Sequence, residues 1–171
     1  PKSSETERIE MNKLAAAIVL TSQGVPFIHA GEEMLRTKSG AENSYNLPDS
    51  INRLDWSRKA RYRDVHEYYK GLIAMRKQHP AFRLTSEELI QKHLEFLDIS
   101  EPILVGYILK DNAGGDAWKE IAVVFNGNAS AKTIAVPERN WVLVADGQTV
   151  DIDAIGVLKT GRLQVPPRSA M

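Results

Sequence analysis

Gly24-Val-Pro-Phe-Ile-His-Ala-Gly-Glu-Glu33 joins a short apolar run to two acidic residues. An apolar run of this length without polar alternation is typical of a strand covered on both faces, as in a parallel sheet. We therefore predict a buried strand over residues 25–30, with His29 buried inside it and its ring nitrogens satisfied locally. A long polar loop follows, and loops of that length usually serve a functional site.

Helices are predicted on both sides of this strand and loop. A capping box begins at Ser4, and apolar residues between Met11 and Ile18 then repeat at helical spacing. Residues 65–76 repeat at the same spacing and end before Pro80. The order helix, strand, long loop, helix is typical of an α/β fold whose functional loops follow the C-terminal ends of its strands.

The period changes beyond residue 80. Ser86 is a predicted helix cap, and a short helix is expected over residues 86–92. Short strand-like runs then follow at close intervals, separated by turn signals such as Asp111-Asn-Ala-Gly-Gly115. The runs are 103–109, 121–125, 132–136, 141–144 and 162–165. Such a series predicts an antiparallel β-sandwich.

Two segments carry a resemblance to a known family. Residues 24–33 resemble the eighth strand of the catalytic (β/α)8 barrel in the α-amylase clan of glycoside hydrolases. Residues 43–56, with Asn43-Ser-Tyr45 and Pro48-Asp-Ser-Ile-Asn-Arg-Leu-Asp-Trp56, are similar to debranching members, type I pullulanases most of all. The similarity continues through residues 68–77 into the β-rich half. It implies an α+β fragment: a helix-strand-helix remnant of a (β/α)8 barrel over residues 1–80, then the C-terminal all-β sandwich over residues 81–171.

The same resemblance implies where the chemistry lies. Such enzymes use an Asp nucleophile, a Glu acid/base and a second Asp after barrel strands four, five and seven, and these positions would precede Pro1. No catalytic residue is therefore assigned here, and we expect an inactive fragment of an enzyme that hydrolyses α-1,6-glucosidic linkages with retention. The alternatives are another specificity in the clan, such as isoamylase or α-1,4 hydrolysis, and a non-catalytic carbohydrate-binding or interaction module built on the sandwich.

The polar loop supplies the candidate substrate-binding groups. Amide and guanidinium groups can bind several sugar hydroxyls, and an aromatic face can lie against a pyranose ring. The same side chains could instead hold the loop together, Trp56 could belong to the core, and Glu33 could pair with Arg36 or Arg53. The candidates are Glu33, Asn43, Tyr45, Asn46, Asp49, Asn52, Arg53, Asp55 and Trp56. In the sandwich, core packing is favoured over sugar binding for Trp118, Phe125 and Trp141.

Composition limits the classes of partner. The 22 basic residues balance the 22 acidic ones, so net charge gives no reason to bind nucleic acid or an anionic membrane. A neutral α-glucan such as pullulan, starch or glycogen is a compatible partner. No metal or other cofactor is predicted, because no second ligand lies at metal-binding spacing from His29. The absence of cysteine leaves the redox compartment and the localisation open.

A fragment of a barrel has exposed surfaces. Without the rest of the barrel, a strand at residues 25–30 would have unpaired edges and its helices would expose apolar faces. We therefore expect residues 1–80 either to pack back on the sandwich in a non-native way or to pair with a second copy.

Overall fold

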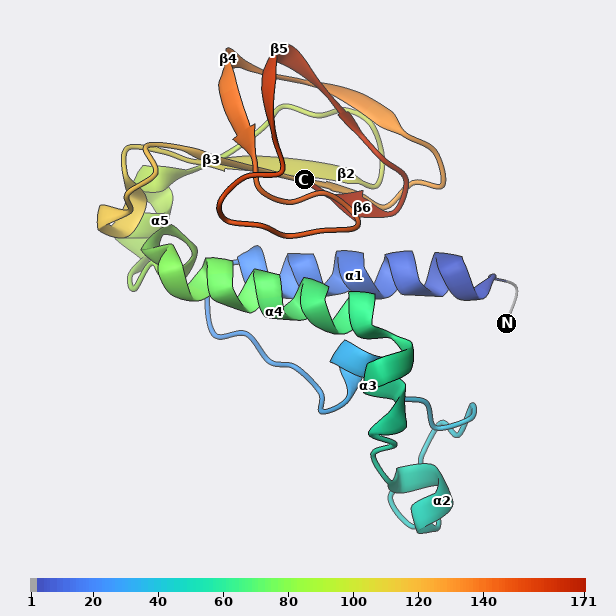
Figure 1. Cartoon of the computed structure of the whole chain (residues 1–171). Helices are drawn as coiled ribbons and strands as arrows, with labels where there is room; N and C mark the ends of the chain where they lie inside the picture. The colour runs from blue at the N-terminus through green and yellow to red at the C-terminus, as the bar shows by residue number, and fades with distance from the viewer. Residues whose placement is uncertain (1–2) are drawn as a thin grey trace.

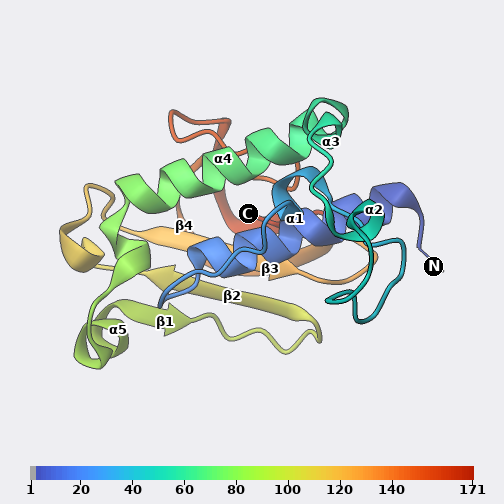
Figure 2. The same cartoon turned by 90° about the horizontal axis from the view of Figure 1, so that it is seen from below.

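The computed structural model describes residues 3–171, the Thr160 side chain excepted, and arranges them in three layers. Helices α1 (Glu5–Thr21) and α4 (Arg63–Gln78) cover one face of a four-stranded antiparallel sheet, and a two-stranded sheet lies over its other face (Figures 1 and 2). The four-stranded sheet has the order β1-β2-β3-β6, and β4 pairs with β5. The strands are β1 (Leu94–Phe96), β2 (Leu104–Leu109), β3 (Ile121–Asn126), β4 (Lys132–Leu143), β5 (Gly156–Val165) and β6 (Ser169–Ala170).

Shorter helical segments connect these layers. The α-helical ones are α2 (Asp49–Asn52), α3 (Ser57–Arg61) and α5 (Glu87–His93), and the 3-10 turns are η1 (Glu32–Met34), η2 (Pro80–Arg83) and η3 (Ala113–Gly115). The helix predicted over residues 86–92 is confirmed as α5, with the Ser86 hydroxyl accepting a hydrogen bond from the Leu89 amide at 3.3 Å. Among the described residues, no helix is long and apolar enough to cross a membrane.

Helix α1 begins as predicted but buries a different face. The Ser4 hydroxyl accepts from the Glu7 amide at 3.2 Å, and the Glu7 carboxylate accepts from the Ser4 amide at 2.8 Å, which completes the capping box. Met11 and Ile18 are 43% and 41% exposed. The buried side chains of α1 are instead Lys13, Leu14, Ala16, Ala17, Leu20 and Thr21. Small alanine side chains let α1 approach α4 and the sheet closely, so the apolar periodicity predicted the helix but not its buried face.

Helix α4 buries most of its predicted apolar side and also satisfies the carbonyls at the end of α1. Val65, Tyr69 and Leu72 are buried as predicted, whereas Ile73 is 40% exposed. The buried Arg76 guanidinium donates hydrogen bonds to the carbonyls of Leu20 and Ser22, at 2.9 and 2.7 Å. The last carbonyls of a helix have no partner within it, so this arginine satisfies groups that would otherwise be unpaired.

The predicted strand over residues 25–30 is wrong for this chain. These residues have no regular secondary structure, and Val25 and Phe27 are 98% and 85% exposed. His29 is exposed instead of buried. A strand exists only where a neighbour accepts and donates its ladder hydrogen bonds, and no described residue pairs with this segment.

The β-rich half follows the prediction with two differences. The runs 132–136 and 141–144 belong to one strand, β4, which is irregular between Ala135 and Arg139. Pro137 lies inside this irregularity, as expected for a residue without a backbone donor. Strands β1 and β6 were not predicted, because runs of three and two residues are too short to show a period.

Two apolar cores lie on the two faces of the larger sheet. Phe125 and Ile121 of β3 belong to the core shared with α1 and α4. Val124, on the opposite face, belongs to a second core with residues of β4 and β5. Because side chains alternate along a strand, β3 joins the helical layer to the sandwich.

A buried hydrogen bond between two side chains fastens the end of α4 to the turn before β3. The His79 Nδ1 and Asp116 Oδ1 atoms lie 2.9 Å apart, and both side chains are almost fully buried. The same carboxylate accepts from the amides of Ala81 and Trp118, at 3.2 and 2.9 Å. The Trp118 indole stacks on the His79 ring with centroids 3.5 Å apart.

Candidate functional site

The polar loop, residues 31–56, is braced from inside by Asn52. The Asn52 amide nitrogen donates to the carbonyls of Ser44 and Leu47, at 2.6 and 2.8 Å. Its side-chain oxygen Oδ1 accepts from Lys38 at 3.4 Å, and the Lys38 ammonium also contacts the Ser44 hydroxyl. Asn52 therefore holds the loop together, which was the alternative to sugar binding for the polar residues of this segment.

The two ends of the loop are also held locally. Gly31 has a φ of 96°, and a Cβ there would lie 2.8 Å from the Arg36 Cβ, so glycine is required at this turn. The Glu33 carboxylate accepts from the Gly31 amide at 3.0 Å, and no ion pair joins Glu33 to Arg36 or Arg53 in the described part of the chain. At the other end the Asp55 carboxylate accepts from the Ser57 hydroxyl and amide, at 2.6 and 3.1 Å. These two hydrogen bonds lower the pKa of Asp55 and favour its ionised form.

The other candidates point into solvent. Tyr45 and Trp56 are 83% and 66% exposed, so the alternative that Trp56 belongs to the core is wrong. The loop and α2 project away from the helical layer on the side opposite the sheets (Figure 1). The exposed polar candidates are Asn43, Asn46, Asp49 and Arg53. The loop can thus present two aromatic faces and several hydrogen-bonding groups on a braced scaffold.

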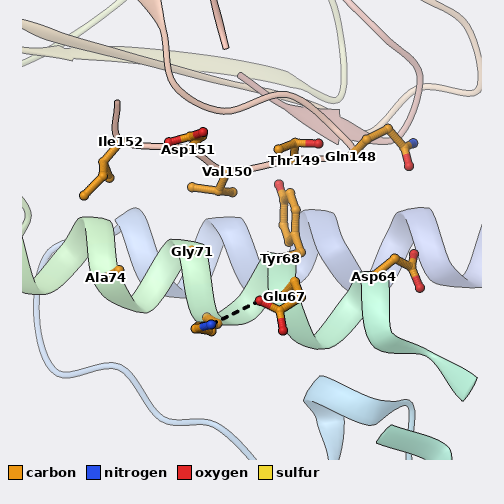
Figure 3. A pocket seen from close by; sticks show the side chains of 11 residues that line it. Asp64, Glu67, Tyr68, Gly71, Ala74, Gln148, Thr149, Val150, Asp151 and Ile152 are labelled. Atoms are coloured by element: carbon orange, nitrogen blue, oxygen red, sulfur yellow. Dashed lines mark hydrogen bonds and ion pairs between the residues drawn. The ribbon is translucent and has the colours of Figure 1, made fainter. Parts of the chain in front are cut away.

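A groove that the sequence does not predict lies between α4 and residues 148–152 (Figure 3). It has a volume of about 400 Å³. The Asp146 carboxylate shapes the turn by accepting from the amides of Gln148 and Thr149, both at 2.7 Å. The turn packs closely on α4 at Gly71, which has no side chain. A Cβ there would lie 2.8 Å from the Val150 carbonyl oxygen. In the sequence, Asp146-Gly147 is a turn signal and does not indicate a groove.

Tyr68 forms the buried side of this groove, and Lys13 of α1 contacts residues that line it. The Tyr68 ring points from α4 toward Thr149 (Figure 3), and its buried hydroxyl has no hydrogen-bond partner among the described residues. Burial raises the pKa of Tyr68 above its usual value. The Lys13 ammonium lies 3.1 Å from the Asp64 carboxylate and 5.4 Å from the Tyr68 ring centroid. A lysine on the buried side of a helix is not visible in an apolar pattern.

A second cavity, the tryptophan cavity, opens between the start of β3 and the second half of β4 and has a volume of about 440 Å³. Trp118 and Trp141 line it and are half-buried, whereas Phe125 is 8% exposed and lies in the core as predicted. The polar side chains on its wall are Lys119, Glu120, Arg139 and Asn140. Among the described residues, no group of three or more His, Asp or Glu side chains could hold a metal ion.

Comparisons with known proteins match the chain along almost its whole length. Residues 90–149 match the family model described as the all-beta domain of pullulanase. The pullulanase of Bacillus subtilis (strain 168) is 44% identical over 161 residues, which are 94% of this chain and 22% of that protein. The pullulanase structure from Bacillus acidopullulyticus has a TM-score of 0.94 at 45% identity and covers 99% of this chain and 21% of its own. The pullulanase from Anoxybacillus sp. LM18-11, complexed with maltotetraose, has a TM-score of 0.87 at 36% identity, over 98% of this chain and 23% of its own.

These matches confirm the resemblance to type I pullulanases and correct one expectation. The chain spans about a fifth of the length of these relatives. Because the structural match includes 99% of the chain, α1 and α4 lie on the sheet as the equivalent helices do in the Bacillus acidopullulyticus enzyme. The prediction that residues 1–80 pack on the sandwich in a non-native way is therefore wrong.

Proposed function

We propose that this chain is the C-terminal part of a pullulanase-type debranching enzyme that hydrolyses α-1,6-glucosidic linkages in pullulan and branched glucans of the starch and glycogen type. The observation that carries this proposal is the 44% identity to a pullulanase over 94% of the chain, which includes the polar loop as well as the β-rich half. The catalytic carboxylates would be supplied by the part of the enzyme outside this chain.

Residues 1–80 would be the end of the catalytic (β/α)8 barrel, and residues 81–171 the sandwich domain beside it. Helices α1 and α4 bury one side against the sheet, and α1 also carries the exposed apolar residues Met11 and Val19. The segment 25–30 leaves α1 on the side away from the sheets (Figure 1). The strands of a barrel would pair with this segment and cover the exposed apolar residues, which supports the placement.

The polar loop would form part of the wall of the glucan cleft. In barrel enzymes the loops after the C-terminal ends of the strands build the active site, and this loop follows the segment assigned to the eighth strand. Its bracing around Asn52 would hold Tyr45 and Trp56 ready to stack on sugar rings. Asn43, Asn46, Asp49 and Arg53 would bind hydroxyls, while Glu33 and Asp55 would mainly keep the loop in shape.

The loop assignment is tested in the chain extended upstream to a complete barrel. We expect Tyr45→Ala and Trp56→Ala each to raise the KM for pullulan about 2- to 10-fold, because each removes one aromatic contact with a sugar ring. Steady-state rates of reducing-sugar release give KM and kcat separately. Ser50→Ala, an exposed change in the same loop, is the matched control and should leave KM unchanged. Wild-type KM values for both aromatic variants would show that the loop does not contact the substrate.

The exposed side of the barrel segment should also make this chain self-associate. Phe27 is 85% exposed beside other apolar side chains, and burying one such residue stabilises a contact by about 1.5–3 kcal/mol. We expect concentration-dependent association in sedimentation equilibrium, weakened more than about tenfold by Phe27→Asp. Val157→Asp is the matched control, because Val157 is an exposed apolar residue of β5, on the far side of the molecule. A monomer at every concentration would rule out this contact.

A further inference from the structure

We propose that the tryptophan cavity binds a short segment of α-glucan and is a second glucan contact, separate from the polar loop. This inference rests on the proposed function, which supplies the class of ligand. The shape and chemistry of the cavity supply the site.

Both tryptophans are fixed in place before any ligand arrives. The Trp118 amide donates to the buried Asp116 carboxylate at 2.9 Å, and one face of its indole stacks on His79 at 3.5 Å. Only the other face of Trp118 is therefore available to a ligand. The Trp141 indole nitrogen donates to the Pro137 carbonyl at 3.0 Å, and its ring packs against the core between the sheets. Side chains held in this way lose little conformational freedom on binding.

The polar groups of the cavity suit a neutral ligand rich in hydroxyls. The Arg139 guanidinium and the Glu120 carboxylate pair at 2.5 Å, and their side chains are 46% and 16% exposed. This carboxylate and this guanidinium neutralise each other, and the exposed Lys119 ammonium on the same wall adds further donors for hydroxyl groups. The exposed Asn140 amide adds one acceptor and two donors at the rim. Indole faces and hydrogen-bonding groups together match the apolar face and the hydroxyls of a pyranose ring.

The position of the cavity makes it a site of its own. Its volume of about 440 Å³ lies within the range of small-molecule pockets, about 300–1,000 Å³. The helical layer lies between the sheets and the polar loop (Figure 1), so the two surfaces cannot form one continuous cleft. A glucan held at the sandwich would therefore be a second attachment that raises the local concentration of substrate near the barrel.

The groove beside α4 is a weaker candidate for the same ligand. It meets the tryptophan cavity at Ile152, which lines both. Its three carboxylates are already engaged. Asp64 pairs with Lys13 at 3.1 Å, Glu67 pairs with Lys70 at 3.3 Å, and Asp151 accepts from the Asp153 amide at 3.0 Å. Its aromatic residue, Tyr68, is 2% exposed and has no free face for a sugar ring.

Nuclear magnetic resonance of this chain tests the proposal. Its three tryptophans give three indole N–H signals, which the variants Trp56→Phe, Trp118→Phe and Trp141→Phe assign. On titration with maltotetraose we expect saturable shifts of the Trp118 and Trp141 signals. Asn140→Ala should raise the apparent Kd about fivefold by removing a hydrogen bond to the sugar. The matched control is Thr133→Ala, another exposed polar change in β4 but outside the cavity.

The outcomes separate this site from the proposed function. If the Trp118 and Trp141 signals stay in place while only the Trp56 signal shifts, the tryptophan cavity is not a glucan site and the loop assignment gains support. If all three signals stay in place, the cavity proposal is overturned, while pullulan hydrolysis by the extended enzyme still decides the proposed function. An equal Kd for Asn140→Ala and the parent chain, with both folded by their amide spectra, would also contradict the proposed contact.

Discussion

We expect this chain alone to release no reducing sugar from pullulan, and we expect the same chain extended upstream to a complete barrel to be active. A retaining glycosidase needs two carboxyl groups about 5 Å apart, facing each other across the scissile bond. Glu32 and Glu33 lie next to each other in the turn η1, and Asp49 and Asp55 lie on the projecting polar loop. Enzymes accelerate such reactions by at least about 10⁶-fold, so the expected difference is between a measurable rate and background.

The matched experiment compares both proteins at equal molar concentration, with the extended form carrying Asp49→Asn and Asp55→Asn as separate variants. Both variants should keep activity within about tenfold of the parent, since neither acid is expected to take part in the chemistry. Activity in the short chain would contradict the placement of the catalytic carboxylates and make Glu33, Asp49 and Asp55 the first suspects. If neither protein were active, a non-catalytic carbohydrate-binding module would be the better interpretation.

The parts of the fold that depend on local interactions were predictable from the sequence. The capping box at Ser4 and the Ser86 cap each depend on residues close together in the chain, and the strand predicted over residues 103–109 pairs with the strands directly before and after it. The strand predicted over residues 25–30 does not form, because its apolar pattern suits a sheet that the described residues do not supply. The buried face of α1 also escaped prediction, because it includes Lys13 and small alanines instead of the larger apolar residues.

The candidate sites divide in the same way. The polar loop was recognisable because its aromatic, amide and charged residues lie within one segment, and the structure adds that Asn52 braces it. The tryptophan cavity was not recognisable from the sequence, because residues 117–122 and 139–144 are brought together only by the sheets. Sequence reasoning weighed Trp118 and Trp141 separately and favoured the core for each. Their shared cavity becomes visible only when both strands are in place.

The buried Asp116 should matter more to stability than any exposed charge of the chain. Asp116→Ala leaves the His79 ring and the amides of Ala81 and Trp118 without their acceptor. Leaving a buried donor without its acceptor costs about 1–3 kcal/mol, so with three such groups we expect the free energy of unfolding to fall by about 3–5 kcal/mol. Denaturation in urea at pH 7, followed by circular dichroism, measures the change.

Asp116→Asn is the matched control, because its side-chain oxygen can still accept the two hydrogen bonds made to Oδ1. We expect a smaller loss for this variant, about 1–3 kcal/mol, from the hydrogen bond to Ala81 that its amide nitrogen cannot accept. If the free energy of unfolding fell equally for the two variants, the hydrogen bonds to Oδ1 would not contribute to stability. Asp116 also holds Trp118 against His79. We therefore expect Asp116→Ala to weaken the glucan-induced shift of the Trp118 indole signal and Asp116→Asn to preserve it. This result would link the stability of this corner to the tryptophan cavity.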